Sequence, residues 1–278
     1  MKKLVLVLSL VLLSTTLLFA GGDQEEGDGF SGDYAFGGST TVDPIITAAI
    51  EEWKDIHPNV HISYEGVGSS NGIKGVLSEQ YSLGGASREP RDTEIEQGVK
   101  STPISMDAVA VIVNKESVAI SNLSLEEVAK IYAKEITNWS EVGGPDAEIV
   151  VFNRDEASGT YETFEVKVMK AVDKEFSGEE VVVTSNGDMV AKVGSQPNAI
   201  GYCGLGYLEA DPGIKAVTVD GIPSEIENVY DGSYPIWRYL NVVYTGELEG
   251  VEEAFVEYLL SDDGQAIVEE VGFIALPE

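Results

Sequence analysis

An arginine followed by small and hydroxyl residues, where an apolar strand gives way to a helix, has the clearest chemical potential in the chain. Residues 149–152 predict a buried strand, and apolar side chains at helical spacing from Phe164 to Val172 predict a helix that begins near the Ser-Gly-Thr turn at 158–160. The first backbone N–H groups of a helix lack partners within it, and the helix dipole favours negative charge there. The guanidinium of Arg154 could add two parallel hydrogen bonds to an oxyanion. This segment therefore predicts an anion-binding site.

The same order of strand, small-residue turn and helix occurs at two other places. Residues 35–46 run from a short strand through Gly-Gly-Ser-Thr-Thr into a helix that reaches Trp53, and residues 60–73 run from a second strand through Gly-Ser-Ser-Asn-Gly into another helix. In open α/β sheets, ligands bind beyond the carboxyl ends of the strands, where all three turns would lie. We therefore expect three helix N-termini to contact one ligand.

Each turn also has a simpler interpretation. A Ser-Gly-Thr sequence before a helix is commonly an N-cap, and Arg154 could form a structural ion pair with Asp155 or Glu156. Residues 66–68 look like part of a dinucleotide-binding fingerprint, but the third glycine is displaced to Gly72 and no acidic residue follows a second strand at the required distance. The sequence also lacks a Gly-Lys-Ser/Thr phosphate loop, so nucleotide binding is not expected.

The residue pairs that hydrolytic catalysis needs are missing from the sequence. The histidines, His57 and His61, fall in a turn and at the start of a strand, and no lysine is placed by a motif as a base. The single cysteine, Cys203, excludes an internal disulfide and the usual zinc patterns, and its apolar neighbours predict a buried thiol. We expect no enzyme activity, no metal site and no cofactor.

The formal net charge of −31 at pH 7 makes the chain strongly acidic. Nucleic acids and anionic membranes require a basic surface, so both classes of partner are excluded. A small anion is not excluded, because exposed charges are screened within about 8 Å at physiological salt, while a buried ligand interacts mainly with the donors that touch it.

The amino terminus predicts export. A basic start at 1–3 is followed by apolar and small residues from Leu4 to Ala20, a pattern that is typical of a signal peptide and short for a membrane span. We expect residues 1–20 to be removed, and residues 21–32, which are acidic and Gly-rich, to form a flexible lead-in. No cysteine stands near this junction, so a lipid anchor is not expected and the predicted location is periplasmic.

Strands and helices alternate along the rest of the chain, which predicts an α/β fold without repeats. The further strands expected are one that ends within 83–90, then 108–114, 181–184, 200–203, 216–219 and a long strand at 235–244 able to pass between lobes. The further helices expected are a charged helix to Gln97, one from Ser124 to Tyr132 that begins with a capping box, one at 251–260 and a short one at the carboxy terminus.

Taken together, the turn sequences resemble those of the phosphate-binding proteins of bacterial phosphate ABC importers. The resemblance implies a type II periplasmic binding protein with two lobes, each a mixed sheet flanked by helices, and with two crossover strands as the hinge. It places lobe 1 at 33–105 and 237–278 and lobe 2 at 106–236. The segments that match, in order over nearly the whole mature chain, are Gly38-Ser39-Thr40-Thr41-Val42, Gly68-Ser69-Ser70-Asn71-Gly72-Ile73, Gly85-Ala86-Ser87-Arg88, residues 136–144 and Arg154 with Ser158-Gly159-Thr160.

The resemblance also implies a function without chemistry of its own. A receptor of this family binds inorganic phosphate, works as a monomer and delivers its ligand to an inner-membrane ABC permease. Glu156 falls where the family often has an acid that pairs with the site arginine. The ligand-binding residues expected are Ser39, Thr40 and Thr41 from the first turn, Ser69 and Ser70 from the second, Ser87 and Arg88 from the third, and Arg154, Ser158, Gly159 and Thr160 from lobe 2.

Arg88 departs from the better-known members of the family, which place an aspartate there to accept a phosphate proton and repel sulfate, although Ser-Arg-Glu resembles a shorter branch. If Arg88 points into the site, sulfate should compete within about a hundredfold of phosphate. If Arg88 points away and Glu89 or another carboxylate accepts the proton, selectivity should be far greater, and we favour this outcome. The alternatives are a receptor for sulfate, molybdate or an organic phosphate and, from another class, a phosphate-ester hydrolase that would need a metal or a nucleophile–base pair.

Overall fold

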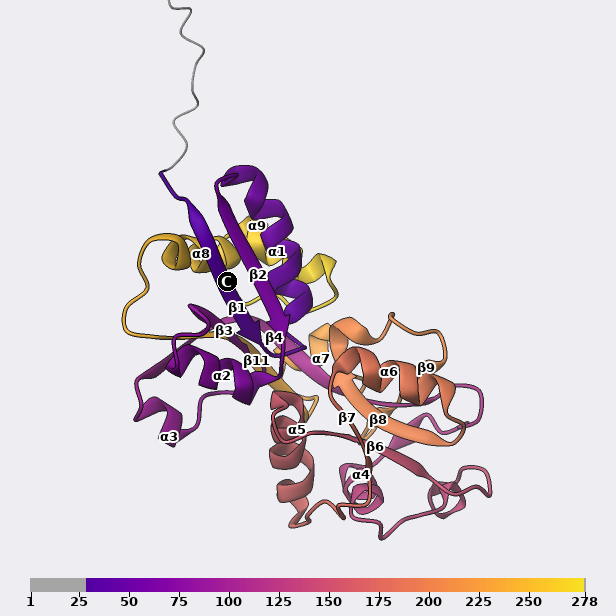
Figure 1. The fold of residues 1–278 in the computed structure, drawn as a ribbon. Helices are drawn as coiled ribbons and strands as arrows, with labels where there is room; N and C mark the ends of the chain where they lie inside the picture. The colour runs from indigo at the N-terminus through magenta and orange to yellow at the C-terminus, as the bar shows by residue number, and fades with distance from the viewer. Residues whose placement is uncertain (1–28, 278) are drawn as a thin grey trace, which may run out of the picture.

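The structure is a computed structural model that describes residues 29–277 (Figure 1). The predicted signal peptide, and residues 21–28 of the predicted lead-in, lie outside the described residues. The chain has the predicted two-lobed α/β fold: its indigo N-terminal and yellow C-terminal segments share one lobe, and the middle of the chain forms the other. Within the described range, no helix is long and apolar enough to cross a membrane.

The elements alternate as the sequence indicates. The strands are β1 Gly32–Gly38, β2 Val60–Gly66, β3 Leu83–Ala86, β4 Val99–Asn114, β5 Asn122–Leu123, β6 Val150–Arg154, β7 Val181–Val183, β8 Ala199–Gly204, β9 Ile214–Ala216, β10 Thr218–Val219 and β11 Trp237–Thr245. The α-helices are α1 Asp43–Ile56, α2 Ser69–Leu77, α3 Asp92–Ile95, α4 Leu125–Tyr132, α5 Gly159–Phe164, α6 Asn186–Ser195, α7 Ile226–Tyr230, α8 Gly250–Leu260 and α9 Asp262–Glu270.

A mixed sheet runs through both lobes in the order β2-β1-β3-β11-β4-β8-β6-β7, with β9 also paired to β4. The β1, β2 and β3 strands are parallel, so their carboxyl ends lie at one edge, and β6 is parallel to β8 in the other lobe. The long strand predicted at 235–244 is confirmed as β11, which pairs antiparallel with β3 and β4. The second strand that crosses between the lobes is β4, which pairs with β11 over residues 99–108 and with β8 over residues 109–113.

The strand predicted at 108–114 begins earlier than expected, at Val99. Pro103 is unfavourable inside a strand, because proline has no N–H to donate to a sheet. The structure accommodates it at an irregularity, where the register with β11 shifts between Leu240 and Asn241 and Asn241 faces Pro103. The strand predicted at 216–219 is also different, because it divides into β9, which pairs with β4, and β10, which pairs with β5.

Apolar side chains are buried mainly in two large clusters, one in each lobe. The larger cluster draws on residues between 106 and 236 together with Ile274, and includes the fully buried Tyr132, Trp139 and Phe164. The second cluster draws on residues 36–104 and 240–273 and is centred on aromatic side chains such as Phe255. Burial of this apolar surface is the main stabilising term for each lobe. The exact division of the chain between the lobes stays a prediction.

Local sequence rules explain most helix boundaries. The capping box predicted at Ser124 is confirmed: its Oγ accepts from the Glu127 N–H at 3.2 Å, and Glu127 Oε2 accepts from the Ser124 N–H at 2.7 Å. The helix predicted from 160 to 172 is helical throughout but not α-helical throughout. After α5 it continues as a π-helical turn at Glu165–Met169 and a 3-10 turn at Lys170–Val172.

A glycine on α2 brings the start of that helix against the ends of the central strands. A Cβ atom at Gly72 would lie 2.5 Å from the Gly38 Cα and 2.7 Å from the Gly37 carbonyl oxygen. Both are backbone atoms of β1, which cannot move without displacing the sheet. The absence of a side chain at Gly72 therefore sets the distance between the first two turns.

We expect Gly72→Ala to lower the free energy of unfolding by about 1 to 3 kcal/mol, because the added methyl group overlaps the backbone. Chemical denaturation monitored by circular dichroism measures the change. Gly187→Ala in α6 is the matched control, because nothing lies closer than 3.9 Å to a Cβ atom there. That helical substitution should be neutral or stabilise by up to about 1 kcal/mol. Equal stability of the two variants would contradict the role given to Gly72.

Candidate functional site

Turns from both lobes meet at one place in the structure. Thr41, from the turn after β1, has its Oγ1 atom 3.1 Å from the Oγ1 of Thr160 on α5. The backbone N–H of Ser70, at the start of α2, donates to the Ala157 carbonyl at 3.0 Å. The predicted meeting of several helix N-termini is thus seen in the geometry, with the lobes in contact.

Gly159 allows the closest approach between the lobes. A Cβ atom there would lie 2.6 Å from Ser87 Oγ and would also overlap Ser69 Oγ. These two serine hydroxyls are 3.2 Å apart, and Ser69 Oγ accepts from the Ser87 N–H at 3.0 Å. The structure therefore brings the second and third turns of one lobe onto the first residue of α5 in the other.

Arg154 ends β6 with its side chain buried, only 2% exposed. Its Nη2 donates to the Thr184 carbonyl at 3.0 Å and to Thr40 Oγ1 at 3.3 Å, while Nε and Nη1 have no partner within residues 29–277. Burial lowers the pKa of Arg154, because the charged form is poorly solvated there. Two buried nitrogens, which carry three N–H groups without an acceptor, indicate that an acceptor belongs beside them.

The simpler interpretation of Arg154 as a structural ion-pair partner is wrong. Within the described residues, neither Asp155 nor Glu156 makes an ion pair with it, and the family-based pairing with Glu156 is not seen either. Asp155 Oδ1 instead accepts from the Ala157 N–H at 2.8 Å and shapes the turn before α5. Asp155 thus orders the turn while the arginine keeps free donors.

Capping groups fix the two principal turns. Ser158 Oγ accepts from the Tyr161 N–H at 3.2 Å, so Ser158 is the N-cap of α5. Gly159 and Thr160 then occupy the first helical positions, whose N–H groups have no partner within a helix. In the first turn, Ser39 Oγ accepts from the Thr41 N–H at 3.0 Å. The N-cap interpretation of Ser158 is therefore correct, and it is compatible with anion binding by the two residues that follow.

Arg88 is buried but directed toward carboxylates. Its Nη1 and Nη2 donate to the two oxygens of Glu94 at 2.7 and 2.8 Å, and its Nε lies 2.9 Å from Glu162 Oε2. The remaining donors go to the Glu89 carbonyl and to Ser70 Oγ. The four N–H groups of Nη1 and Nη2 are therefore used, whereas Nε lies within ion-pair distance of Glu162 but has no hydrogen-bond partner among the described residues. The Arg88 guanidinium therefore faces carboxylates, and it is ion-paired with Glu162 on α5.

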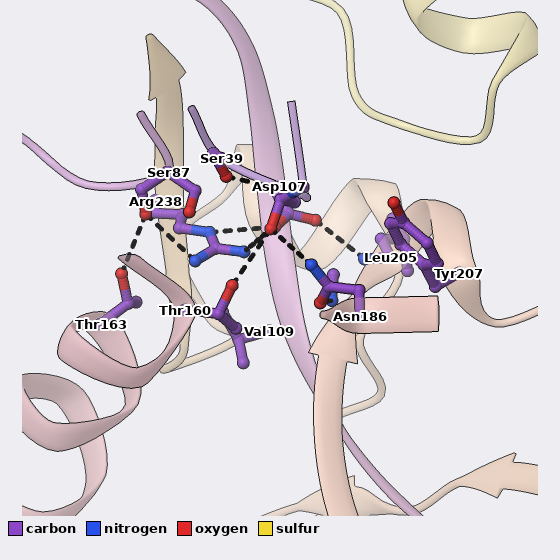
Figure 2. Close-up of polar contacts among 12 residues, drawn as sticks. Ser39, Ser87, Asp107, Val109, Thr160, Thr163, Asn186, Leu205, Tyr207 and Arg238 are labelled. Carbon is purple, nitrogen blue, oxygen red and sulfur yellow. Dashed lines mark hydrogen bonds and ion pairs between the residues drawn. The ribbon is translucent and has the colours of Figure 1, made fainter. Parts of the chain in front are cut away.

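Three further buried polar residues adjoin the site and were not among the predicted site residues: Asp107, Asn186 and Arg238 (Figure 2). Arg238 donates through Nε and Nη2 to Asp107 Oδ2 at 3.0 and 2.7 Å, and Asp107 Oδ1 accepts from the Leu205 N–H at 2.8 Å. Arg238 also donates to the Ser87 carbonyl at 3.0 Å. A charged residue beside the apolar run of β4 was a signal that could have singled out Asp107.

The local charge of the site differs from that of the whole chain. Burial raises the pKa of Asp107, and the guanidinium of Arg238 opposes this rise. The Asp107–Arg238 pair is neutral as a unit, which leaves Arg154 as an uncompensated positive charge. Despite the net charge of −31, the place where the turns meet is suited to an anion.

The arrangement supports binding rather than catalysis. Its groups are hydroxyls, guanidinium donors and helix N-termini, and no histidine or lysine contacts the hydroxyls of Thr41, Ser69 or Ser158 in the described part of the chain. Likewise, residues 29–277 contain no group of three or more potential metal ligands. Convergent donors of this kind could hold a small oxyanion from all sides.

Comparisons with known proteins agree with this geometry. A sequence model described as PBP superfamily domain matches residues 24–263. The chain is 35% identical over 284 residues to phosphate-binding protein PstS of Borreliella burgdorferi, covering 99% of each chain. It is 30% identical to the PstS of Bacillus subtilis, covering 89% of this chain and 82% of that one.

A solved structure has a similar fold. That protein, from Clostridium perfringens, is described provisionally as a phosphate ABC transporter substrate-binding protein, and its structure contains bound phosphate. It matches with a TM-score of 0.83 at 34% identity, covering 88% of this chain and 100% of that chain.

We expect Asp107→Ala to lower the free energy of unfolding by about 3 to 5 kcal/mol, because Arg238 is then buried without its counter-charge. Urea denaturation gives the value. The double variant Asp107→Ala with Arg238→Met removes both charges and should be more stable than Asp107→Ala alone. A single variant within about 1 kcal/mol of the native protein would show that the pair is not important for stability.

Proposed function

This chain belongs to the PBP superfamily and to the family of PstS phosphate-binding proteins, and on that premise we propose that it is an exported receptor that binds inorganic phosphate and delivers it to an ABC import permease. The observation that supports the ligand most directly is Arg154, which is buried near the N-terminus of α5 and has two donor nitrogens, Nε and Nη1, without a partner in residues 29–277. A tetrahedral oxyanion satisfies such donors by accepting charge-assisted hydrogen bonds. No chemical step is part of this function.

The proposed ligand contacts come from both lobes. Hydroxyl and N–H groups of the first three turns supply one side, and the guanidinium of Arg154 with the start of α5 supplies the other. Arg88 is proposed to act through Glu94 and Glu162 instead of touching the ligand, because its two Nη groups are held by acceptors of the protein and its Nε is ion-paired with Glu162. The residues proposed to contact phosphate are Thr40, Thr41, Ser69, Arg154, Ser158, Gly159 and Thr160, with Ser39, Ser70 and Ser87 supporting them.

We further propose that the lobes, at 33–105 with 237–278 and at 106–236, move about β4 and β11 as a hinge. The two large apolar clusters lie largely on opposite sides of this division, which supports it.

The receptor would act as a monomer in the periplasm, which it would reach through the predicted signal peptide. The rival assignment to sulfate would require a site without an acceptor for a phosphate proton. Glu89, one acceptor considered from the sequence, is exposed and accepts from Asn241 at 3.2 Å.

Arg154→Ala should abolish measurable phosphate binding while the protein stays folded, because two or more charge-assisted hydrogen bonds of about 1.5 to 3 kcal/mol each are lost. Isothermal titration calorimetry of ligand-stripped protein with phosphate, and with sulfate for comparison, tests this. Lys192→Ala removes one exposed positive charge from α6 in the same lobe and should leave affinity unchanged. Retained binding by Arg154→Ala, or stronger binding of sulfate than of phosphate by the native protein, would refute the assignment.

Phosphate should also compact the protein, because contacts from both lobes are satisfied only when the lobes are closed. Small-angle X-ray scattering should show a smaller radius of gyration, and the melting temperature should rise, when saturating phosphate is added. Arg154→Ala serves as the control and should show neither change. Identical scattering with and without phosphate, in a preparation that binds it, would remove the hinge motion from the proposal.

A further inference from the structure

The orientation of one buried amide is determined by its backbone partner. Asn186, at the start of α6, is fully buried, and its Oδ1 accepts from the Gly204 N–H at 3.2 Å. A backbone N–H can only donate, so the oxygen of the amide must face Gly204 and the NH₂ group must face the other way. The two hydrogens of that group go to Thr40 Oγ1 at 3.1 Å and to Thr41 Oγ1 at 2.9 Å.

This amide leaves the hydroxyl of Thr41 only one direction for its own hydrogen. A hydroxyl oxygen has two lone pairs. Thr41 Oγ1 accepts from Asn186 Nδ2 and from Arg238 Nη2, the latter at 3.3 Å. Both lone pairs are then used, so the hydrogen of Thr41 must be donated toward Thr160 Oγ1 or a ligand.

Thr40 is restricted in the same way. Its Oγ1 accepts from Asn186 Nδ2 at 3.1 Å and from Arg154 Nη2 at 3.3 Å. Neither partner can present an acceptor atom to Thr40 instead. A guanidinium has no acceptor atom, and the oxygen of the Asn186 amide is held by the Gly204 N–H. The Thr40 hydroxyl is therefore also a donor only.

Arg238 cannot relax this restriction by turning away. Its Nε and Nη2 are held by Asp107 Oδ2, and its Nη1 donates to the Ser87 carbonyl at 3.0 Å. Figure 2 shows the guanidinium beside Asp107, with the Asn186 amide and the Thr160 hydroxyl directed toward the same point. The donor direction of Thr41 is thus set by two side chains that are themselves fixed.

The two serines at the other side of the site are not restricted in this way. Ser69 Oγ accepts from the Ser87 N–H, which leaves it a second lone pair, and the contact between Ser69 Oγ and Ser87 Oγ can run in either direction. Both hydroxyls lie against Gly159, at the start of α5. This pair can therefore accept a hydrogen from a ligand, whereas Thr40 and Thr41 cannot.

We propose that Asn186, supported by Arg238 and Asp107, is a positioning residue that makes Thr40 and Thr41 obligate donors, and that the site thereby selects the protonation state of its ligand. The inference rests on the proposed phosphate-binding function. Oxygens that face the threonines must be unprotonated, so a ligand proton can be accepted only away from them, for example by the Ser69–Ser87 pair. Hydrogen phosphate, the dianion, meets this condition more readily than dihydrogen phosphate, because it has one proton to place away from the threonines instead of two.

The titratable groups around the threonines cannot produce tighter binding at pH 8. Arg154 on β6 and Arg238 on β11 remain guanidinium ions. Burial raises the pKa of Cys203 on β8 and of Tyr207 above their ordinary values, so both stay neutral. Burial also raises the pKa of Asp107 on β4, which Arg238 opposes, and the pKa of Asp43 at the start of α1. Protonation of either carboxyl would remove a negative charge and favour an anion at pH 6, so tighter binding at pH 8 reports on the ligand.

Calorimetric titration at pH 6 and pH 8 tests the inference. The native protein should bind phosphate more tightly at pH 8, in proportion to the fraction present as dianion. Asn186→Asp replaces the NH₂ donor with an acceptor, so the threonine hydrogens turn toward it. Affinity at pH 8 should fall about a hundredfold, and binding should become tighter at pH 6 than at pH 8. Asn71→Asp, the same substitution at an exposed position of α2, should keep the native affinity and pH profile.

Each other outcome has a defined meaning. An Asn186→Asp variant that is folded by circular dichroism and keeps the native pH profile would overturn the inference, as would a native affinity that is equal at both pH values or greater at pH 6. If Asn186→Asp does not fold, Asn186→Ala replaces it and should bind about tenfold more weakly at pH 8, with a weaker pH dependence. No heat from phosphate with the native protein at either pH would instead refute the proposed function itself.

Discussion

The buried ion pair between Asp107 and Arg238 is the interaction on which the site depends. The two residues face each other directly across β4 and β11, the strands that connect the lobes. Removing two charges from water is costly, and the cost is offset here because the guanidinium also donates to Ser87 and Thr41. This cross-strand pair therefore connects the strands between the lobes to the first and third turns by hydrogen bonds. The sheet thereby holds those turns in position.

The acidity of the chain and its affinity for anions are compatible because they operate over different distances. The chain has 48 acidic and 17 basic residues, but most of these charges are exposed and screened by salt. The site is enclosed and has its own fixed donors, of which Arg154 has no counter-charge within the described residues. Selection of a ligand is thus decided by short-range hydrogen bonds, while the surface charge governs solubility and excludes polyanionic partners.

Much of the fold and the core of the site could be predicted from the sequence, because the relevant signals are local. The apolar strand before Arg154 and the small residues after it define both the turn and the start of α5. Asn186 could not be found in this way, because its role depends on Gly204 and on two threonines more than a hundred residues away in sequence. The ion pairs of Arg88 with Glu94 and Glu162 could not be predicted from the sequence either, because Glu162 comes from the other lobe.

Glu162 has a consequence for the protein without its ligand. It lies on the first turns of α5 and is paired with Arg88 at 2.9 Å and with Arg91 at 2.6 Å, both from the opposite lobe. In the proposed hinge motion this ion pair would form on closure without a ligand, and it would lower the free energy of the closed form of the empty protein. A larger population of the closed form reduces the work that ligand binding must supply to shift the equilibrium, and raises the apparent affinity accordingly. On this proposal, Arg88 would act on binding through the balance between open and closed molecules.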